Sequence, residues 1–279
     1  MNDISVQPIS GALGAEISGV DLSRDLSNEQ FNAVHQAFLD HQVIFFRDQK
    51  ISHDQHKAFA RRFGTLNIHP YVKGMDGHPE IMQIVKEPAD KVNFGGGWHT
   101  DMSFLEEPAL GSLLYAKEVP SVGGDTLWAN QYLAYDTLSS GMKEMLGRLK
   151  AIHTAKGEYS ERGHSAQKRG SMDVAVAGDD VPSYEHPVVR THPETGRKAL
   201  YVNMAFTEKF AGMTRRESLP LLKFLFEHCT QEGFTCRFRW TAGTLAFWDN
   251  RCTQHFALND YQGKRRHMER VTVNGDKPF

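Results

Sequence analysis

Three stretches of the chain combine a helix-start signal with apolar residues at helical spacing. A Ser or Thr followed three residues later by Gln or Glu begins each stretch, at Ser27, Ser52 and Thr214, which is the spacing of a capping box. Apolar side chains then recur every three or four residues, so one face of each helix is expected to be buried. The pattern predicts three helices, and the third is expected to pack on the outer face of a sheet.

Most other apolar segments are short and bounded by Gly, Pro, Asn or Asp, which is typical of strands. Many short strands with few helices favour a double-sheet jelly roll over a doubly wound parallel sheet. The chain is therefore predicted to be mainly β with peripheral helices, as a cupin-like double-stranded β-helix. The predicted strands are VIFF at 43–46 and, from residue 80 onward, EIMQIV, LLYAKEV, HPVVRTH, KALYVN, FTCRFRW, TLAFWD and ERVTV.

One polar segment interrupts this pattern. Residues 155–183 are rich in charged and small residues and only weakly periodic, so they are interpreted as a mobile surface loop and a candidate lid. No internal repeat or low-complexity tract divides the chain, and 279 residues are enough for one sizeable core. The sequence therefore predicts a single domain over residues 1–279.

Composition and charge limit the partners. Apolar residues make up 40% and charged residues 24% of the chain, as in ordinary soluble globular proteins. The formal net charge is 32 − 34 = −2 without long runs of one sign, so neither nucleic acid nor an anionic membrane is an expected partner. No signal region is recognisable at the amino terminus, and no stretch approaches the roughly 20 apolar residues that span a bilayer. Neither export nor membrane insertion is expected.

Cysteine usage indicates the compartment. Cys229, Cys236 and Cys252 are the only cysteines, and no two of them form a C-x-x-C pair. An odd number without paired spacing argues against a disulfide framework and against a zinc ribbon. A reducing, cytoplasmic location is therefore expected.

Four His-x-Asp or His-x-Glu pairs are candidate metal ligands, although about 1.7 would arise by chance from 14 histidines and 34 acidic residues. Proline separates the two residues at His78 and His192, which marks a turn. His99 and Asp101 instead follow a glycine-rich segment and precede Met-Ser-Phe, which is expected to be an apolar strand. Residues i and i+2 of a strand share a face, so these two side chains could reach one ion.

Longer segments around this pair are distinctive. Four of them occur in this order: WHTDMSF, PSVGGDTLWAN, WDNRCTQHFALNDY and RRHMERVTV. Four more segments lie towards the two ends of the chain: GALGAEISGVDL, QVIFFRDQ, RRFGTLNIHP and VNGDKPF. Together they resemble the taurine dioxygenase and 2,4-dichlorophenoxyacetate dioxygenase (TauD/TfdA) family of Fe(II)- and 2-oxoglutarate-dependent dioxygenases. An ordered combination of this length is far more specific than any single H-x-D motif.

The resemblance implies a metal centre and a cosubstrate site. His99 and Asp101 would be the near pair of Fe(II) ligands, with His255 of WDNRCTQH as the third. A facial triad of this kind leaves positions open for a bidentate cosubstrate and O₂. Thr126 would hydrogen-bond 2-oxoglutarate, and Arg266 would pair with its distal carboxylate through the planar guanidinium fork. The cosubstrate would be converted into succinate and CO₂.

The resemblance also implies a small anionic organic substrate: a sulfonate, an aryloxyalkanoate or another carboxylate. Arg270 and His69 would bind its acidic group, and Phe206 and Tyr159 would line the apolar side. Gly95 stands where taurine-specific relatives carry asparagine, so acceptance of taurine stays open. Since an aspartate supplies the carboxylate ligand, no position is vacant for a halide, and hydroxylation is expected rather than chlorination.

Two other interpretations remain. The chain could be a cupin-like protein with a structural metal, or a non-catalytic module that binds a metal or a small acid. A structural metal site is normally closed by a fourth ligand, and none is indicated beside these motifs. Cys252 is near His255 in sequence, but its odd offset on a strand would direct it to the other face. The sequence is also compatible with a homo-oligomer.

Overall fold

The computed structural model describes residues 4–160, 171–176, 178 and 181–279. Its strands are β1 Ser5–Pro8, β2 Ala15–Ser18, β3 Val43–Phe46, β4 Ile81–Lys86, β5 Ala109–Glu118, β6 Thr126–Asn130, β7 Lys150–Thr154, β8 Ser183–Pro187, β9 Val189–Thr191, β10 Lys198–Leu200, β11 Thr207–Phe210, β12 Thr235–Phe238, β13 Leu245–Asp249, β14 Thr253–Ala257 and β15 Arg266–Asn274. Its helices are α1 Asn28–His41, α2 His53–Arg61, α3 Gln131–Asp136, α4 Ser140–Leu146, α5 Lys156–Tyr159, α6 Arg215–Cys229 and the 3₁₀ helix η1 Glu232–Phe234. The described chain is mainly β, as predicted.

The three predicted helices are confirmed as α1, α2 and α6. Ser27, Ser52 and Thr214 are their N-caps, and each side chain accepts a hydrogen bond from the third helical N–H while the Gln or Glu there reaches back to the cap. These reciprocal bonds satisfy backbone donors that would otherwise lack partners, which explains why the helices begin at these residues.

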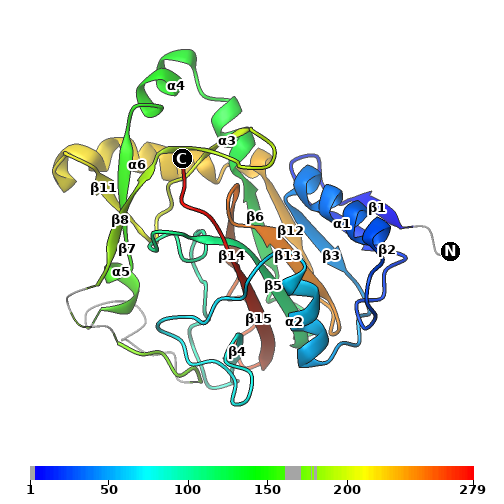
Figure 1. Ribbon diagram of the computed structural model, residues 1–279. Coiled ribbons are helices and arrows are strands. Elements are labelled where there is room, and N and C mark those ends of the chain that lie inside the picture. The colour runs from blue at the N-terminus through cyan, green and yellow to red at the C-terminus, as the bar shows by residue number, and fades with distance from the viewer. Residues whose placement is uncertain (1–3, 161–170, 177, 179–180) are drawn as a thin grey trace.

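A seven-stranded sheet forms the main layer, with strand order β1-β2-β3-β13-β5-β15-β4. Its neighbouring strands are antiparallel except for the parallel pair β2 and β3. Strands from the two ends of the chain therefore lie side by side at its centre (Figure 1). Residues i and i+2 of each strand share a face, so the sheet has two distinct surfaces.

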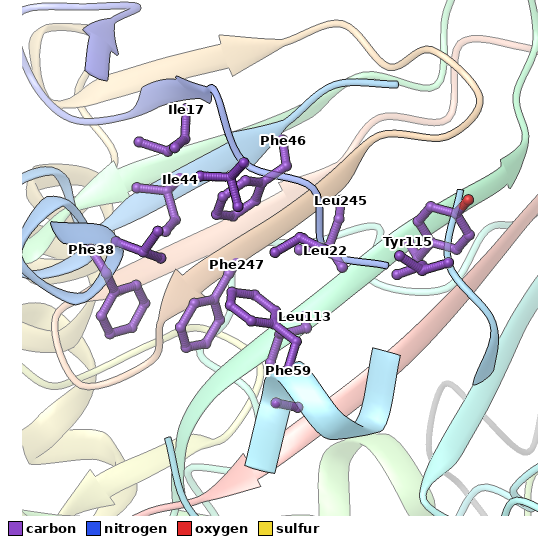
Figure 2. Close-up of a cluster of buried hydrophobic side chains, with 14 of the residues drawn as sticks. Ile17, Leu22, Phe38, Ile44, Phe46, Phe59, Leu113, Tyr115, Leu245 and Phe247 are labelled. Carbon is purple, nitrogen blue, oxygen red and sulfur yellow. The ribbon is translucent and has the colours of Figure 1, made fainter. Parts of the chain in front are cut away.

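Helices α1 and α2 cover the outer surface of this sheet. Phe38 of α1 stacks on Phe247 of β13 with ring centres 4.1 Å apart, and Phe59 of α2 packs edge-on to Phe46 of β3 (Figure 2). Burying this apolar layer is the main local source of stability. Its buried members include Ile17, Val34, Phe38, Ile44, Phe46, Phe59, Leu113, Tyr115, Leu245, Phe247, Val271 and Val273.

The inner surface faces a second, three-stranded antiparallel sheet of order β12-β6-β14. Trp128 of β6 lies between the sheets, with its ring centre 5.3 Å from that of Phe45 on β3 and 5.8 Å from that of Trp248 on β13. Phe45 also stacks on Phe238 of β12 at 3.7 Å. The inner core is thus built from aromatic side chains of both sheets.

A third group of elements lies beside these sheets (Figure 1). The sheet β11-β7-β8 and the hairpin β9–β10 pack with α3 and α6 around a separate apolar cluster that includes Ala151, Leu200, Phe210, Leu222 and Leu225. The prediction that the third helix packs against a sheet is therefore confirmed by the contact of α6 with β11.

The expected apolar strand after His99 is wrong. His99 makes a single β-bridge to His255, and Asp101 to Phe104 form turns. Met102 has a φ of 52°, a left-handed conformation that interrupts extended backbone. Strand β14, which carries His255, was not among the strands predicted from alternation, because its sequence TQHFA lacks a clear pattern.

Of the predicted loop at 155–183, residues 161–170, 177, 179 and 180 lie outside the described residues. The described remainder includes α5 at its start, and Val174 forms a β-bridge to Val72. Among the described residues, no helix is long and apolar enough to cross a membrane.

Candidate metal and cosubstrate site

The backbone brings the two segments of the predicted metal site together. The N–H of His99 donates to the carbonyl of His255 at 3.1 Å, and the N–H of His255 donates to the carbonyl of His99 at 2.8 Å. Thr100 adds a hydrogen bond from Oγ1 to the carbonyl of Thr253 at 2.9 Å. This bridge, rather than a shared strand face, places His99, Asp101 and His255 around one point.

The three side chains have the geometry of a metal site. Asp101 Oδ1 lies 3.7 Å from His99 Nε2 and 3.9 Å from His255 Nε2, and one ligand atom from each residue lies within 4.8 Å of the other two. All three residues are buried. Two imidazole nitrogens and one carboxylate oxygen form the donor set typical of a non-haem Fe(II) facial triad, so these residues fit the ion.

The tautomer of His99 suits this role. Its Nδ1 lies 2.7 Å from the carbonyl oxygen of Gly97, and because a carbonyl only accepts, Nδ1 carries the proton. The lone pair is therefore on Nε2, the atom that faces Asp101. Gly95, with a φ of 75°, lies close by, and a Cβ there would approach His99 Cε1 to 3.2 Å.

Asp101 is held ionised by its surroundings. Burial alone raises the pKa of this carboxyl, but the Arg270 guanidinium, both histidines and a hydrogen bond from Ser112 outweigh it and hold the pKa well below its usual range. Arg270 Nη1 donates to Oδ1 and Ser112 Oγ donates to Oδ2, each at 2.7 Å. The carboxylate is therefore ready to bind a cation.

Asn250 and Ser112 are functional candidates that the sequence did not indicate. Asn250 Oδ1 accepts hydrogen bonds from the N–H of Asp101 at 3.3 Å and from Trp248 Nε1 at 3.0 Å, and its Nδ2 donates to Ser112 Oγ at 3.2 Å. Both residues are fully buried. Ser112 on β5 and Asn250 in the turn after β13 gave no signal of this network, because their link to Asp101 joins residues far apart in the sequence or in separate elements.

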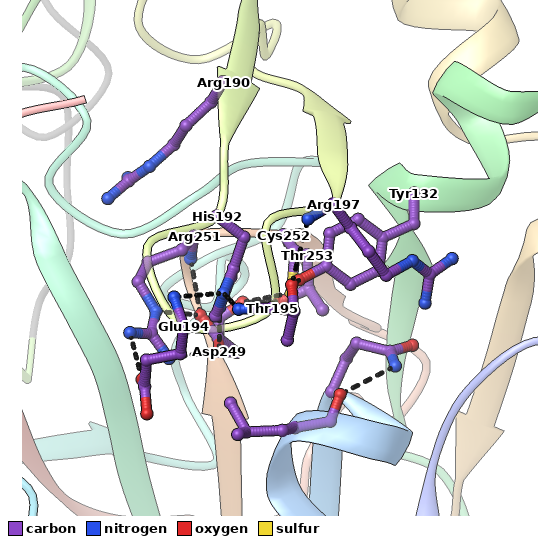
Figure 3. A network of polar contacts seen from close by, with 12 residues as sticks. Tyr132, Arg190, His192, Glu194, Thr195, Arg197, Asp249, Arg251, Cys252 and Thr253 are labelled. Atoms are coloured by element: carbon purple, nitrogen blue, oxygen red, sulfur yellow. Dashed lines mark hydrogen bonds and ion pairs between the residues drawn. The ribbon is translucent and has the colours of Figure 1, made fainter. Parts of the chain in front are cut away.

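A second cluster with ligand-type side chains, His192, Asp249 and Cys252, does not suit a metal (Figure 3). Asp249 already accepts four hydrogen bonds, three of them from Arg251 and one from His192 Nε2. His192 Nδ1 accepts two backbone N–H groups, so the proton is on Nε2 and no ring lone pair is free. Burial and Asp249 raise the pKa of the Cys252 thiol well above its usual value.

The other three His-x-Glu pairs are engaged elsewhere. His78 contacts Lys57 at 2.8 Å, Glu194 pairs with Arg251 at 2.6 Å, and Glu269 contacts His53 at 3.2 Å. Among the described residues, only His99 and Asp101 gather with a third potential ligand around an open cavity. The pair that the sequence context indicated thus lies beside the cavity together with His255.

Thr126 and Arg266, the predicted cosubstrate residues, converge on Trp240. Trp240 Nε1 donates to Thr126 Oγ1 at 3.0 Å, and the guanidinium carbon of Arg266 lies 5.8 Å from the centre of the Trp240 ring. Arg266 is buried, and its Nε and Nη2 have no hydrogen-bond partner in the described part of the chain. A buried, unpaired edge of a guanidinium fits the carboxylate of 2-oxoglutarate.

The four predicted substrate residues share one cavity of about 640 Å³ beside the metal ligands. Arg270, His69, Tyr159 and Phe206 all line it, together with His99 and Asp101. In contrast, neither Thr126 nor Arg266 is among its lining residues. The four predicted substrate residues therefore face an open cavity, whereas Thr126 and Arg266 lie outside its lining.

Known proteins share this architecture. Residues 5–272 match the model of the family described as taurine catabolism dioxygenase TauD, TfdA. An alpha-ketoglutarate-dependent sulfate ester dioxygenase of Pseudomonas putida is 37% identical and aligns over 99% of this chain and 91% of its own. The crystal structure of a taurine dioxygenase from Burkholderia xenovorans superposes with a TM-score of 0.83 at 38% identity, covering 99% of this chain and 90% of that one.

A further solved structure shows a relative with a metal and a small ligand. AAD-2 in complex with Mn(II) and N-oxalylglycine has a TM-score of 0.78 at 29% identity, covering 99% of both chains. The family match and the relatives span almost the whole sequence, and the predicted ligand set is assembled in the fold. The chain therefore belongs to the taurine catabolism dioxygenase TauD, TfdA family, and it is a 2-oxoglutarate-dependent dioxygenase.

Proposed function

We propose that this dioxygenase hydroxylates a small organic anion whose acidic group binds to Arg270. The observation that carries the proposal is the position of this arginine, which is 4% exposed yet lines the cavity beside Asp101. Its Nη1 pairs with Asp101, whereas its buried Nε has no partner among the described residues. A buried guanidinium with a free donor favours an anionic partner, because an unsatisfied charged donor is costly.

His69 supports the same role as a neutral donor. Its Nδ1 accepts hydrogen bonds from the N–H groups of Tyr71 and Val72 at 3.1 and 3.0 Å, so the ring proton is on Nε2. Burial, with a contribution from Arg270, lowers the pKa of His69 to about 3, which keeps the ring neutral. We infer that Nε2–H donates to the acidic group of the substrate.

Aromatic side chains define the apolar part of the cavity. Tyr159 stacks on Tyr71 with ring centres 4.7 Å apart, and Phe206 packs against Phe104 at 4.9 Å. Gly95 adds no side chain to the wall, so it offers no polar contact to an amine such as that of taurine. The proposed substrate is therefore an anion with an apolar body, and taurine is a weaker candidate.

Sulfonates, sulfate esters, aryloxyalkanoates and other small carboxylates all meet this description. The P. putida relative is named for sulfate esters and the B. xenovorans structure for taurine, and both kinds of substrate carry a sulfur oxyanion. Such a group accepts several hydrogen bonds, which suits the donors of Arg270 and His69.

The proposed cosubstrate site is formed by Thr126 and Arg266. Fe(II), 2-oxoglutarate and O₂ supply the oxidation, in which 2-oxoglutarate becomes succinate and CO₂ while a C–H bond of the substrate is hydroxylated. His99, Asp101 and His255 would hold the ion from one side and leave its other positions open. Arg270 and His69 would orient the substrate, and the aromatic wall would exclude water from the reaction.

We also infer that the two stacked sheets form a double-stranded β-helix, or jelly roll, within a single domain over residues 1–279. Both sheets contribute site residues, with Arg266 and Arg270 on β15 and Thr126 and His255 on β6 and β14. The segment 155–183 is proposed as the lid, since Tyr159 at the end of α5 lines the cavity. The cytoplasmic location stays a prediction.

Succinate release across a panel of anions tests the proposal. Purified protein with Fe(II) and 2-oxoglutarate is incubated with alkyl sulfates, alkyl sulfonates, aryloxyalkanoates and the matching neutral alcohols. Anions are expected to be turned over and neutral analogues are not. Arg270→Met is expected to raise the KM for the preferred anion about 10- to 100-fold, the effect of losing a charge-assisted hydrogen bond.

Two controls make this test specific. Arg265→Met removes a partly exposed arginine that pairs with Glu87 and Glu118 and does not line the cavity, and it should leave the KM unchanged. His99→Ala should abolish substrate-dependent succinate release. Equal turnover of anions and alcohols, or an unchanged KM in Arg270→Met, would show that the acidic group is not recognised here.

A further inference from the structure

Two buried cations lie opposite each other on neighbouring strands. Lys86 at the end of β4 is the Cα partner of Arg266 at the start of β15 in the antiparallel register. Directly opposed residues in such a pair project from the same face of the sheet. Lys86 is 3% exposed and Arg266 is 5% exposed, so both charges are removed from water.

Neither cation has an anionic partner in the described part of the chain. Lys86 Nζ and the Nε and Nη2 atoms of Arg266 are buried without a hydrogen bond. Each side chain instead faces an aromatic ring: Lys86 Nζ lies 4.7 Å from the centre of the Tyr261 ring, and the guanidinium carbon of Arg266 lies 5.8 Å from the centre of the Trp240 ring. The nearby Asp125 acts on Arg266 through its charge alone, and its Oδ2 is paired with Arg237 at 2.7 Å. Burying two cations without a hydrogen-bonded anion is unfavourable, so the site is expected to receive one.

The surrounding backbone is shaped around these side chains. Gly124 has a φ of 73°, and a Cβ at this position would lie 3.3 Å from both Arg266 Cδ and Tyr261 Cδ1. Arg266 and Tyr261 therefore pack against the turn that leads into Thr126. The Tyr261 ring in turn contacts Lys86, so Tyr261 lies between the two cations beside the turn that leads into Thr126.

We propose that Lys86 is a second cationic residue for the distal carboxylate of 2-oxoglutarate, beside Arg266. The inference rests on the proposed cosubstrate site at Thr126 and Arg266. Nε and Nη2 lie along one edge of the guanidinium, the edge that binds a carboxylate in bidentate fashion. In the proposed complex Lys86 Nζ and the Thr126 hydroxyl would add two donors, which matches the roughly four acceptor positions of a carboxylate.

The proposal makes Lys86 a determinant of cosubstrate choice. Two cations favour a dianionic 2-oxo acid over one that lacks the distal carboxylate, because only the dianion compensates the buried charges. In contrast, a lysine that merely filled space beside Tyr261 would not distinguish the two acids. The difference between the two affinities therefore reports the role of Lys86.

Calorimetric titration of the Mn(II)-loaded protein tests this role without turnover. Wild-type protein is expected to bind 2-oxoglutarate much more tightly than 2-oxopentanoate, in which a methyl group replaces the distal carboxylate. Lys86→Met should weaken 2-oxoglutarate binding about 10- to 100-fold and leave 2-oxopentanoate binding unchanged or tighter. Lys86→Arg, which keeps the charge, should retain most of the preference.

Thermal unfolding of the ligand-free protein provides a second measurement. Lys86→Met removes an unpaired buried charge, so its Tm should equal or exceed that of the wild type. The matched control is Lys117→Met, a lysine on β5 that is 37% exposed and faces Glu269, and it should change neither affinity. A lower Tm, or an equal effect of Lys117→Met on binding, would assign Lys86 a structural role instead.

The two possible failures are distinguishable. If wild-type protein binds both acids equally, the cosubstrate site at Thr126 and Arg266 is wrong, and the role of Lys86 is wrong with it. If wild-type protein prefers 2-oxoglutarate and Lys86→Met keeps the full preference, only the role of Lys86 is overturned.

Discussion

The two oxygens of Asp101 have different partners, and this difference bears on how the residue would bind a metal. Oδ1 faces both histidine Nε2 atoms and accepts a hydrogen bond from Arg270 Nη1, whereas Oδ2 accepts one from Ser112 Oγ. Because Oδ1 is the oxygen that faces both histidines and Oδ2 is held by Ser112, we expect Asp101 to bind the ion through Oδ1 alone. Monodentate binding would keep further positions on the ion open to the reactants.

Ser112→Ala tests this arrangement at the scale of one residue. The substitution removes the donor to Oδ2 and leaves Asn250 Nδ2 without its acceptor, so only the Arg270 hydrogen bond to Oδ1 still orients the Asp101 carboxylate. The affinity for Mn(II), measured by calorimetry, should fall about tenfold. Ser218→Ala, at a buried serine of α6, is the control and should bind Mn(II) like the wild type. Unchanged affinity in Ser112→Ala would refute the positioning role.

At the scale of elements, the capping boxes stabilise helices that cover the sheets. In α6, Thr214 Oγ1 accepts a hydrogen bond from the N–H of Glu217, and the Glu217 carboxylate accepts one from the N–H of Thr214. Thr214→Ala is expected to lower the free energy of unfolding by about 1 kcal/mol. Chemical denaturation measures the change, with the exposed Lys223→Ala on the same helix as the control. A loss of equal size in both variants would argue against the cap.

Elements with strong local signals could be predicted from the sequence, and elements fixed by distant contacts could not. The helices α1, α2 and α6 begin at the predicted caps, because capping involves residues only three positions apart. In contrast, β14 is specified by its pairing with β6, more than 100 residues away, and Met102 adopts its left-handed turn within a tertiary context. Local patterns contain no information about such partners.

In the candidate site, too, some residues could be predicted from the sequence and others could not. The resemblance named His99, Asp101 and His255 correctly as residues that come together, since family segments carry that information. The sequence did not predict a functional role for Ser112 or Lys86, because a serine or a lysine in a strand indicates no role until its neighbours in the sheet are known.

At the scale of the whole molecule, buried neutral histidines link stability to pH. Burial lowers the pKa of His56 and His153 from 6.5 to about 3. Between these values the unfolded chain binds more protons than the folded one, so the free energy of unfolding falls as the pH falls below 6.5. Each group contributes about 1.4 kcal/mol per pH unit in this window.

Urea denaturation at pH 7.5 and pH 5.5 measures this loss, and His56→Gln identifies one source. Glutamine takes up no proton in this range, so the variant should lose about 1 kcal/mol less than the wild type between the two pH values. His41→Gln, at the partly exposed end of α1, serves as the control. The same loss in His56→Gln as in the wild type would contradict the assignment.

Strand β15 carries both proposed anchoring arginines on one face, four residues apart. With a rise of about 3.3 Å per residue, their Cα atoms are separated by roughly 13 Å, and this spacing is set by backbone geometry rather than by flexible loops. The strand thus fixes the distance between the group that binds the substrate and the group that binds the cosubstrate. Substrate range could therefore change through the cavity wall around Arg270 during evolution, while the distance to the cosubstrate, and with it the oxidative chemistry, stays constant.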